Sequence, residues 1–178
     1  METDAEKWSK EEGEKVLKEV GIKEDHIILD FGCGAGTYSL PAAKIVGKKG
    51  QVFALDKSKS KLDELIRKAK SAGLDNINTV ETSGKLIIPL EDRFFDVVLL
   101  YDILHSYYFS LSERRKLLKE VHRTLKPEGL LSVYPEHMEL EETKREIEEA
   151  NFHFEKKYFK TLIHEDRYIN TYILSFRK

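Results

Sequence analysis

The feature that most constrains the fold of this chain is a glycine-rich turn directly after a short apolar run. Residues 30–36 read Asp-Phe-Gly-Cys-Gly-Ala-Gly, and they follow Ile27-Ile28-Leu29. An apolar run of this length, bounded by an acid and glycines, is typical of a strand buried on both faces. Glycines at the junction between a strand and a helix let the backbone approach a ligand closely. The turn therefore predicts a ligand site at the carboxyl end of a buried strand.

Strand and helix patterns alternate after this turn. Helices are expected over about 38–46, from Leu62 to Gly73, from Ser112 to Leu125 and over about 140–150, with strands over 51–55, 77–80, 96–101 and 130–134. Such alternation implies a mostly parallel sheet with helices on both faces, joined by right-handed crossovers. We therefore predict a three-layer α/β/α Rossmann-like sandwich.

The segment before the first strand reads as one amphipathic helix. Ser9 and Glu12 have capping-box spacing, and the apolar positions that follow end at Gly21. Residues 1–20 could fold over the ligand site as a lid. No linker or repeat divides the chain, so a single domain over residues 1–178 is expected.

The C-terminal segment reads as an antiparallel hairpin. Residues 152–159 and 168–176 alternate between apolar and polar side chains, and the polar pair Glu165-Asp166 lies between them. The hairpin would add two strands to the parallel sheet.

Composition excludes several functional classes. The net charge of -2 and the absence of a basic arm predict no nucleic-acid partner. No apolar run is long enough for a membrane span, and the acidic N-terminus does not resemble a signal peptide, so a cytoplasmic location is expected. Cys33 is the single cysteine, and the six histidines show no paired ligand spacing, so no metal site is predicted. The oligomeric state is not defined by the sequence.

Two acids near the glycine turn indicate the kind of ligand. A dinucleotide-binding turn has its third glycine at the position of Thr37, whereas here Gly36 comes one residue earlier. Asp30 would be a poor neighbour for a pyrophosphate but a good one for a cation. Asp56 follows the second strand, 24 positions after Gly32, where a carboxylate can accept hydrogen bonds from both ribose hydroxyls. The pattern favours a cationic ligand that carries a ribose and no phosphate.

At these residues the chain resembles the class I S-adenosylmethionine-dependent methyltransferases, particularly the small-molecule group that includes the ubiquinone and menaquinone methyltransferases. Four segments are similar to the family's motifs. They are 28–36 (Ile-Leu-Asp-Phe-Gly-Cys-Gly-Ala-Gly), 52–56 (Val-Phe-Ala-Leu-Asp), the fourth-strand segment 95–105, and 120–130, which leads into the fifth strand. The resemblance implies a seven-stranded sheet with one reversed strand, S-adenosylmethionine as cofactor and S-adenosylhomocysteine as product.

The cofactor contacts that we expect lie at the ends of the first four strands. The family usually has an acid after the third strand that contacts adenine, whereas this chain reads Glu81-Thr82-Ser83-Gly84, so Ser83 is the expected contact. The predicted cofactor-binding residues are Asp30, Gly32, Gly34, Gly36, Tyr38, Asp56, Lys57, Ser83 and Tyr101.

A methyl acceptor is expected at the ends of the fourth and fifth strands. Methyl transfer from a sulfonium needs alignment, and it needs a base only where the nucleophile must lose a proton. His105 is the candidate catalytic base because its ordinary pKa is near neutral, and Asp102, Tyr107 and His137 are predicted to line the substrate pocket.

The sequence predicts an enzyme that methylates a small molecule. A protein or RNA methyltransferase with an open site, a non-catalytic S-adenosylmethionine-binding module, and an NAD-dependent oxidoreductase remain as alternatives. Structural packing is the competing explanation for His105 and for the tyrosines near it.

Overall fold

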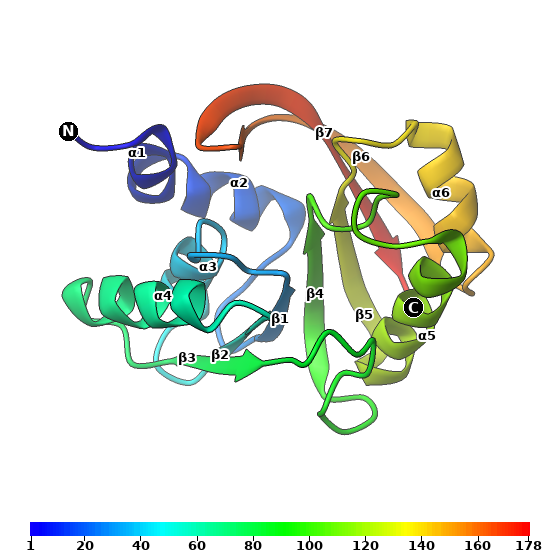
Figure 1. The fold of residues 1–178 in the computed structure, drawn as a ribbon, viewed down its shortest axis with the longest axis horizontal. Helices are drawn as coiled ribbons and strands as arrows, with labels where there is room; N and C mark the ends of the chain where they lie inside the picture. The colour runs from blue at the N-terminus through cyan, green and yellow to red at the C-terminus, as the bar shows by residue number, and fades with distance from the viewer.

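A computed structural model describes residues 1–178 as a single sheet of seven strands with helices on its two faces (Figure 1). The strands are β1 (Ile27–Phe31), β2 (Gln51–Asp56), β3 (Ile77–Glu81), β4 (Phe95–Tyr101), β5 (Leu125–Tyr134), β6 (His153–His164) and β7 (Arg167–Arg177). The helices are α1 (Asp4–Glu11), α2 (Gly13–Val20), α3 (Ser39–Val46), α4 (Lys59–Ser71), α5 (Leu111–Thr124) and α6 (Leu140–Glu148). None of these helices has the length and apolar character needed to cross a membrane.

The strand order is β3-β2-β1-β4-β5-β7-β6, and it confirms the predicted fold. Strands β1 to β5 pair in parallel, and β7 pairs antiparallel with both β5 and β6, so β7 alone is reversed. The order changes direction between β1 and β4. In open sheets of this type a ligand binds beyond the carboxyl ends of the strands at such a switch point.

Alternating side chains of β4 divide the core between the two faces of the sheet. Val97 and Leu99 pack with α1, α2 and α3, whereas Val98 and Leu100 pack with α5 and α6. Figure 1 shows these two groups of helices on opposite sides of the central strands. Because β4 is covered on both faces, its run of apolar residues is buried throughout.

The N-terminal segment differs from the single helix predicted from Ser9. It forms two helices, and the capping box that starts α1 is Thr3 with Glu6. Ser9 is buried inside α1 instead of capping a helix. The first helix ends before Gly13, where the second begins. A Cβ added at Gly13 would lie 2.9 Å from the ring of Trp8, so the absence of a side chain there allows the two helices to pack closely.

Two other boundaries also differ from the prediction. The cap of α5 is Ser110, whose side chain and Glu113 form a capping box, instead of Ser112. Residues 126–129, between the predicted helix and the predicted strand, lie within an irregular β5, where the register against β4 shifts and Glu128 has a positive φ of 61°. The start of α5 was ambiguous in the sequence because two serines lie close together. The start of β5 was ambiguous because the strand contains an irregular, turn-like stretch.

The predicted hairpin is confirmed, and its first strand is longer than expected. Strand β6 continues past residue 159 to His164, and Glu165 and Asp166 both have positive φ in the turn that follows. In Figure 1 the tip of this hairpin reaches over the end of the sheet towards α1. The extension places His164 at the same end of the molecule as the glycine turn.

Candidate functional site

The glycine turn is tightly packed at two of its positions and open at a third. A Cβ added to Gly36, which has a φ of 89°, would lie 2.2 Å from Leu65 Cδ1 on α4. At Gly32 it would lie 2.8 Å from Ile103 Cδ1. At Gly34 the nearest atom would be Lys61 Cδ at 4.0 Å, so the backbone there is bare. The turn therefore presents uncovered backbone to a ligand at Gly34.

Asp56 connects the end of β2 to the glycine turn. Its Oδ2 accepts a hydrogen bond of 2.9 Å from the Gly34 amide, and its Oδ1 accepts one of 2.8 Å from the Ser58 amide. The side chain is only partly buried. Each carboxylate oxygen can accept a further hydrogen bond. The carboxylate is therefore held rigidly and still has capacity for two ligand hydroxyls.

Asp30 lies beneath the turn and is almost fully buried. Ser39 at the start of α3 donates a hydrogen bond of 2.5 Å from Oγ to Asp30 Oδ2. Burial raises the pKa of the Asp30 carboxyl to about 6, and the Ser39 hydrogen bond opposes that rise. A cation placed beside the turn would favour the ionised form of this carboxyl.

The other predicted cofactor contacts fall into two groups. Tyr38 and Tyr101 are buried with ring centroids 4.7 Å apart, and their hydroxyls are bonded to the backbone of Ile163 and to Ser132 Oγ. Contact with a ligand would therefore involve their rings. Lys57 and Ser83 are exposed and follow β2 and β3, on the same edge of the sheet as Asp56.

The acceptor candidates meet around Asp102, which follows β4. Asp102 has a φ of 54°, which is a strained conformation for a residue with a side chain, and its amide donates to the Tyr134 carbonyl at 2.9 Å. Its Oδ1 lies 3.7 Å from His105 Nε2 and 3.7 Å from His137 Nε2. Strained backbone of this kind is common at functional sites.

A third histidine, which the sequence did not suggest, completes this cluster. His164 Nδ1 donates a hydrogen bond of 2.8 Å to Asp102 Oδ2. His164 lies 62 positions from Asp102, and no spacing pattern connects them. The sheet topology brings them together, because the hairpin tip lies over the ends of β4 and β5.

His105 is buried within the loop that joins β4 to α5. Burial lowers the pKa of its imidazole, and the Asp102 carboxylate opposes that change. Its Nδ1 accepts a hydrogen bond of 3.3 Å from the Tyr107 amide. The Tyr107 ring itself is exposed, with its centroid 5.1 Å from that of His137. The predicted base and pocket residues therefore form one cluster.

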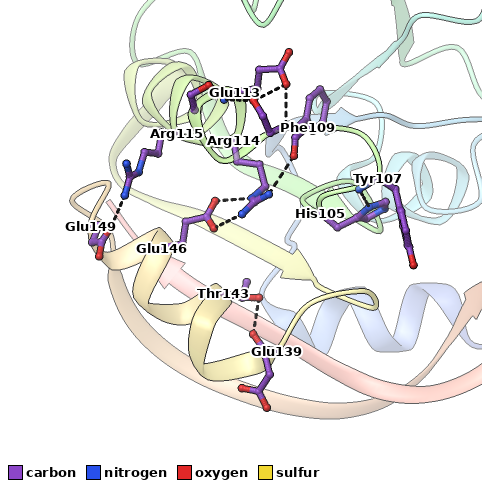
Figure 2. Close-up of polar contacts among 12 residues, drawn as sticks. His105, Tyr107, Phe109, Glu113, Arg114, Arg115, Glu139, Thr143, Glu146 and Glu149 are labelled. Atoms are coloured by element: carbon purple, nitrogen blue, oxygen red, sulfur yellow. Dashed lines mark hydrogen bonds and ion pairs between the residues drawn. The ribbon is translucent and has the colours of Figure 1, made fainter.

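Arg114 and Glu146 hold this loop in place, and neither was predicted. Figure 2 shows the two side chains joined by two bonds, of 2.8 Å and 3.0 Å, between α5 and α6. Arg114 Nη1 also donates to the Phe109 carbonyl at 3.1 Å. Both side chains are buried. Because Phe109 ends the loop that carries His105 and Tyr107, the ion pair positions that loop.

Cys33 is a small side chain packed within the glycine turn. It is buried, and burial raises the pKa of its thiol well above the ordinary range. The thiolate is therefore disfavoured, and a nucleophilic role has no support from its surroundings.

The residues of the glycine turn fit S-adenosylmethionine. The backbone at Gly34 is bare, a rigid carboxylate lies beside it at Asp56, and a second carboxyl lies beneath it at Asp30. These groups match a ligand with ribose hydroxyls and positive charge, whereas two carboxyls beside the turn would repel a pyrophosphate.

Comparisons with known proteins point to the same family. The methyltransferase domain family matches residues 28–129. Demethylmenaquinone methyltransferase from Staphylococcus aureus is 31% identical over 117 residues, which are 66% of this chain and 46% of that protein. The chain thus spans about half the length of these relatives.

Solved structures share the fold over nearly the whole chain. A SAM-dependent methyltransferase from Aquifex aeolicus has a TM-score of 0.78 at 28% identity, with 96% of this chain and 92% of that chain covered. A SAM-dependent methyltransferase from Methanosarcina mazei has a TM-score of 0.75 at 20% identity, with 92% and 96% covered, which is a likeness of fold alone.

The strand order, the glycine turn and the family match over residues 28–129 lead to one assignment. The chain belongs to the class I S-adenosylmethionine-dependent methyltransferases.

Proposed function

We propose that this chain transfers a methyl group from S-adenosylmethionine to a small-molecule acceptor that binds beside Asp102, His105 and His137. The observation that carries the proposal is the position of two polar groups on either side of the β1–β4 switch point. The Asp56–Gly34 junction lies on one side, and the Asp102 cluster lies on the other. A methyl donor and an acceptor would therefore meet across the switch point.

The residues of the chain have separate roles in this proposal. Asp56 binds the ribose hydroxyls, the bare backbone at Gly34 lies against the cofactor, and Asp30 offers charge near its cationic end. Lys57, Ser83, Tyr38 and Tyr101 complete the cofactor surface, the last two through their rings. The cofactor supplies a methyl group that is already activated on a sulfonium, so the chain mainly has to align the acceptor.

His105 is the proposed base for an acceptor that must lose a proton. Lowering of its pKa by burial keeps the imidazole neutral at neutral pH, and a neutral imidazole can accept a proton. Asp102 lies where it can stabilise the resulting imidazolium. Tyr107 and His137 form the wall of the acceptor pocket that is open to solvent.

Similarity to the demethylmenaquinone methyltransferases makes a quinol-type ring the first acceptor to test. The test is a transfer assay with labelled S-adenosylmethionine against a reduced demethylmenaquinone analogue, a panel of small phenols and amines, and protein and RNA extracts. Labelling of a small molecule supports the proposal. Labelling confined to protein or RNA, or cofactor binding with no transfer to any fraction, would contradict it.

Cofactor binding is tested by calorimetric titration with S-adenosylmethionine, S-adenosylhomocysteine and NAD. We expect the first two to bind and NAD not to bind. Asp56→Ala should weaken binding by about 1–3 kcal/mol, because charge-assisted hydrogen bonds to the ribose are lost. The matched control is Asp63→Ala, which removes an exposed carboxylate on α4 that pairs only with Lys59. Equal affinities for the two variants would show that the ribose lies elsewhere.

A further inference from the structure

The Asp102 cluster has the composition and geometry of a metal site. Asp102 Oδ1, His105 Nε2 and His137 Nε2 come from two loops that are distant in sequence, and ligand atoms of the three residues all lie within 4.8 Å of one another. A carboxylate and two imidazoles are ligands that divalent first-row transition ions accept with coordination positions left open. We propose that these three residues bind one such ion, with Zn²⁺ as the representative.

Two of the three distances between the ligand atoms are close to those that an ion requires, and the third, between the two histidines, is within 4.8 Å. Ligand bonds of about 2.0–2.2 Å in a tetrahedral arrangement separate two ligand atoms by roughly 3.4 Å. Each histidine Nε2 lies 3.7 Å from Asp102 Oδ1, which is too long for a hydrogen bond and short enough for a shared ion. Binding of the ion would draw the three ligand atoms closer together.

Asp102 Oδ1 also lacks any other partner. The atom is buried and accepts no hydrogen bond, although a buried carboxylate oxygen left without a partner is costly. A bound cation would satisfy it. The left-handed backbone at Asp102, with a φ of 54°, is a conformation that aspartate tolerates better than most residues.

The second oxygen of Asp102 already has an orienting partner. His164 Nδ1 donates to Asp102 Oδ2 at 2.8 Å, so the carboxylate is held with Oδ1 towards His105 and His137. Partners of this kind fix the direction of a ligand. His164 is therefore a positioning residue of the proposed site.

Ion binding makes a specific demand on His105. Its Nδ1 accepts a bond from the Tyr107 amide at 3.3 Å, which places the ring proton on Nε2. Coordination through Nε2 requires the other tautomer, so this long hydrogen bond must be released. The loop that carries the exposed Tyr107 ring would then move when the ion binds. With the ion bound, His105 serves as a ligand, so its proposed role as a base applies to the metal-free chain.

The test uses the full chain, stripped of metal with a chelator and titrated without methyl donor. Calorimetry with Zn²⁺ and the visible absorption of bound Co²⁺ should both report one ion per chain. His137→Ala, at an exposed residue, should weaken Zn²⁺ binding by more than tenfold and abolish the Co²⁺ spectrum. His164→Ala should weaken it by about 10- to 100-fold, as loss of an orienting partner does. Because cofactor binding is measured separately, failure here leaves the proposed function standing.

The matched control is His153→Ala, which removes an exposed histidine from the start of β6, outside the cluster. Wild type and His153→Ala should bind alike and gain thermal stability with Zn²⁺, whereas His137→Ala should keep its metal-free melting temperature and gain nothing. Asp102→Asn, which tolerates the same backbone conformation, should also lose binding. The proposal is overturned if wild type shows no saturable binding, or if His137→Ala and His153→Ala bind with equal affinity.

Discussion

At the scale of single residues, Asp30 combines burial with an ionisable group. Its folded pKa of about 6 lies above the ordinary value of 3.8. Between about pH 4 and 6 the unfolded chain loses this proton while the folded chain keeps it. The contribution of Asp30 to stability therefore falls as pH rises through that window, by about 3 kcal/mol for a difference of about two pH units, and is constant above it.

Asp30→Asn should remove this pH dependence. The free energy of unfolding of the variant, relative to wild type, should rise between about pH 4 and 6 and then level off. Urea denaturation at several pH values measures it. Ser39→Ala provides the comparison, because loss of its hydrogen bond should extend the window to higher pH. If the difference in unfolding free energy between wild type and Asp30→Asn stays constant from pH 4 to 7, Asp30 has an ordinary pKa in the folded chain.

Gly34 and Gly36 form a second residue-scale pair. Both have positive φ, but a Cβ would meet Leu65 at Gly36 and nothing closer than 4.0 Å at Gly34. Gly34→Ala should cost about 1 kcal/mol from backbone strain. Gly36→Ala should cost at least 2 kcal/mol more, because Leu65 is buried and overpacking adds to the strain. Thermal or urea unfolding of the two variants measures these losses of stability. Equal losses would mean that α4 shifts to accommodate the added methyl group at little cost.

At the scale of elements, a buried ion pair joins α5 and α6 next to an exposed one. Arg114 with Glu146 is buried, whereas Arg115 with Glu149 lies in solvent with a separation of 3.4 Å (Figure 2). Breaking a buried pair leaves one charge without a partner and costs about 3–5 kcal/mol, whereas exposed pairs contribute about 0–1 kcal/mol.

Glu146→Gln should therefore destabilise the protein by several kcal/mol, and Glu149→Gln should change stability by less than about 1 kcal/mol. The double variant Arg114→Met with Glu146→Leu should recover much of the loss, since it leaves no unpaired charge. It should still alter the loop from His105 to Phe109, because the bond to the Phe109 carbonyl is gone. Unfolding measures the first effect, and a change in acceptor KM measures the second. Equal stabilities of Glu146→Gln and Glu149→Gln would show that the buried ion pair contributes no more than the exposed one.

The elements themselves could be predicted because their signals are local. Buried strands such as β4 appear as apolar runs, and the hairpin appears as an alternation of side chains around Glu165-Asp166. The boundary errors at Ser9 and Ser112 have a common cause. Capping residues occur close together at both positions, and tertiary packing decides which one caps the helix.

The juxtaposition of Gly34 with Asp56 could also be predicted, as could the gathering of Asp102, His105 and His137, whereas the position of His164 could not. Gly34 and Asp56 lie at the ends of adjacent parallel strands, so alternation of strands and helices already places them together. His164 meets Asp102 because β6 extends to residue 164 and the hairpin curves over the sheet. Strand length and curvature depend on the pairing of β6 with β7, which no short motif encodes.

At the scale of the whole molecule, the N-terminal helix meets the tip of the C-terminal hairpin. α1 contacts the hairpin through two hydrogen bonds, from the Ala5 amide to Asp166 Oδ1 and from Trp8 Nε1 to the Thr161 carbonyl, at 3.1 Å and 2.7 Å. Trp8 is fully buried against Tyr38, with ring centroids 5.1 Å apart. The segment proposed as a lid is therefore anchored in the core on the side of the sheet that carries α2 and α3.

Trp8 is the only tryptophan, so its fluorescence reports this anchoring directly. If α1 is part of the core, emission is that of a buried indole and resists aqueous quenchers both before and after S-adenosylmethionine is added. Trp8→Ala should then cost about 3–5 kcal/mol of stability, as loss of a buried aromatic residue does. Lys10→Ala, on the exposed face of the same helix, should change stability little. If quenching of Trp8 fluorescence instead decreases when the cofactor binds, Trp8 must be accessible to solvent in the free protein. Residues 1–20 would then close over the site on cofactor binding.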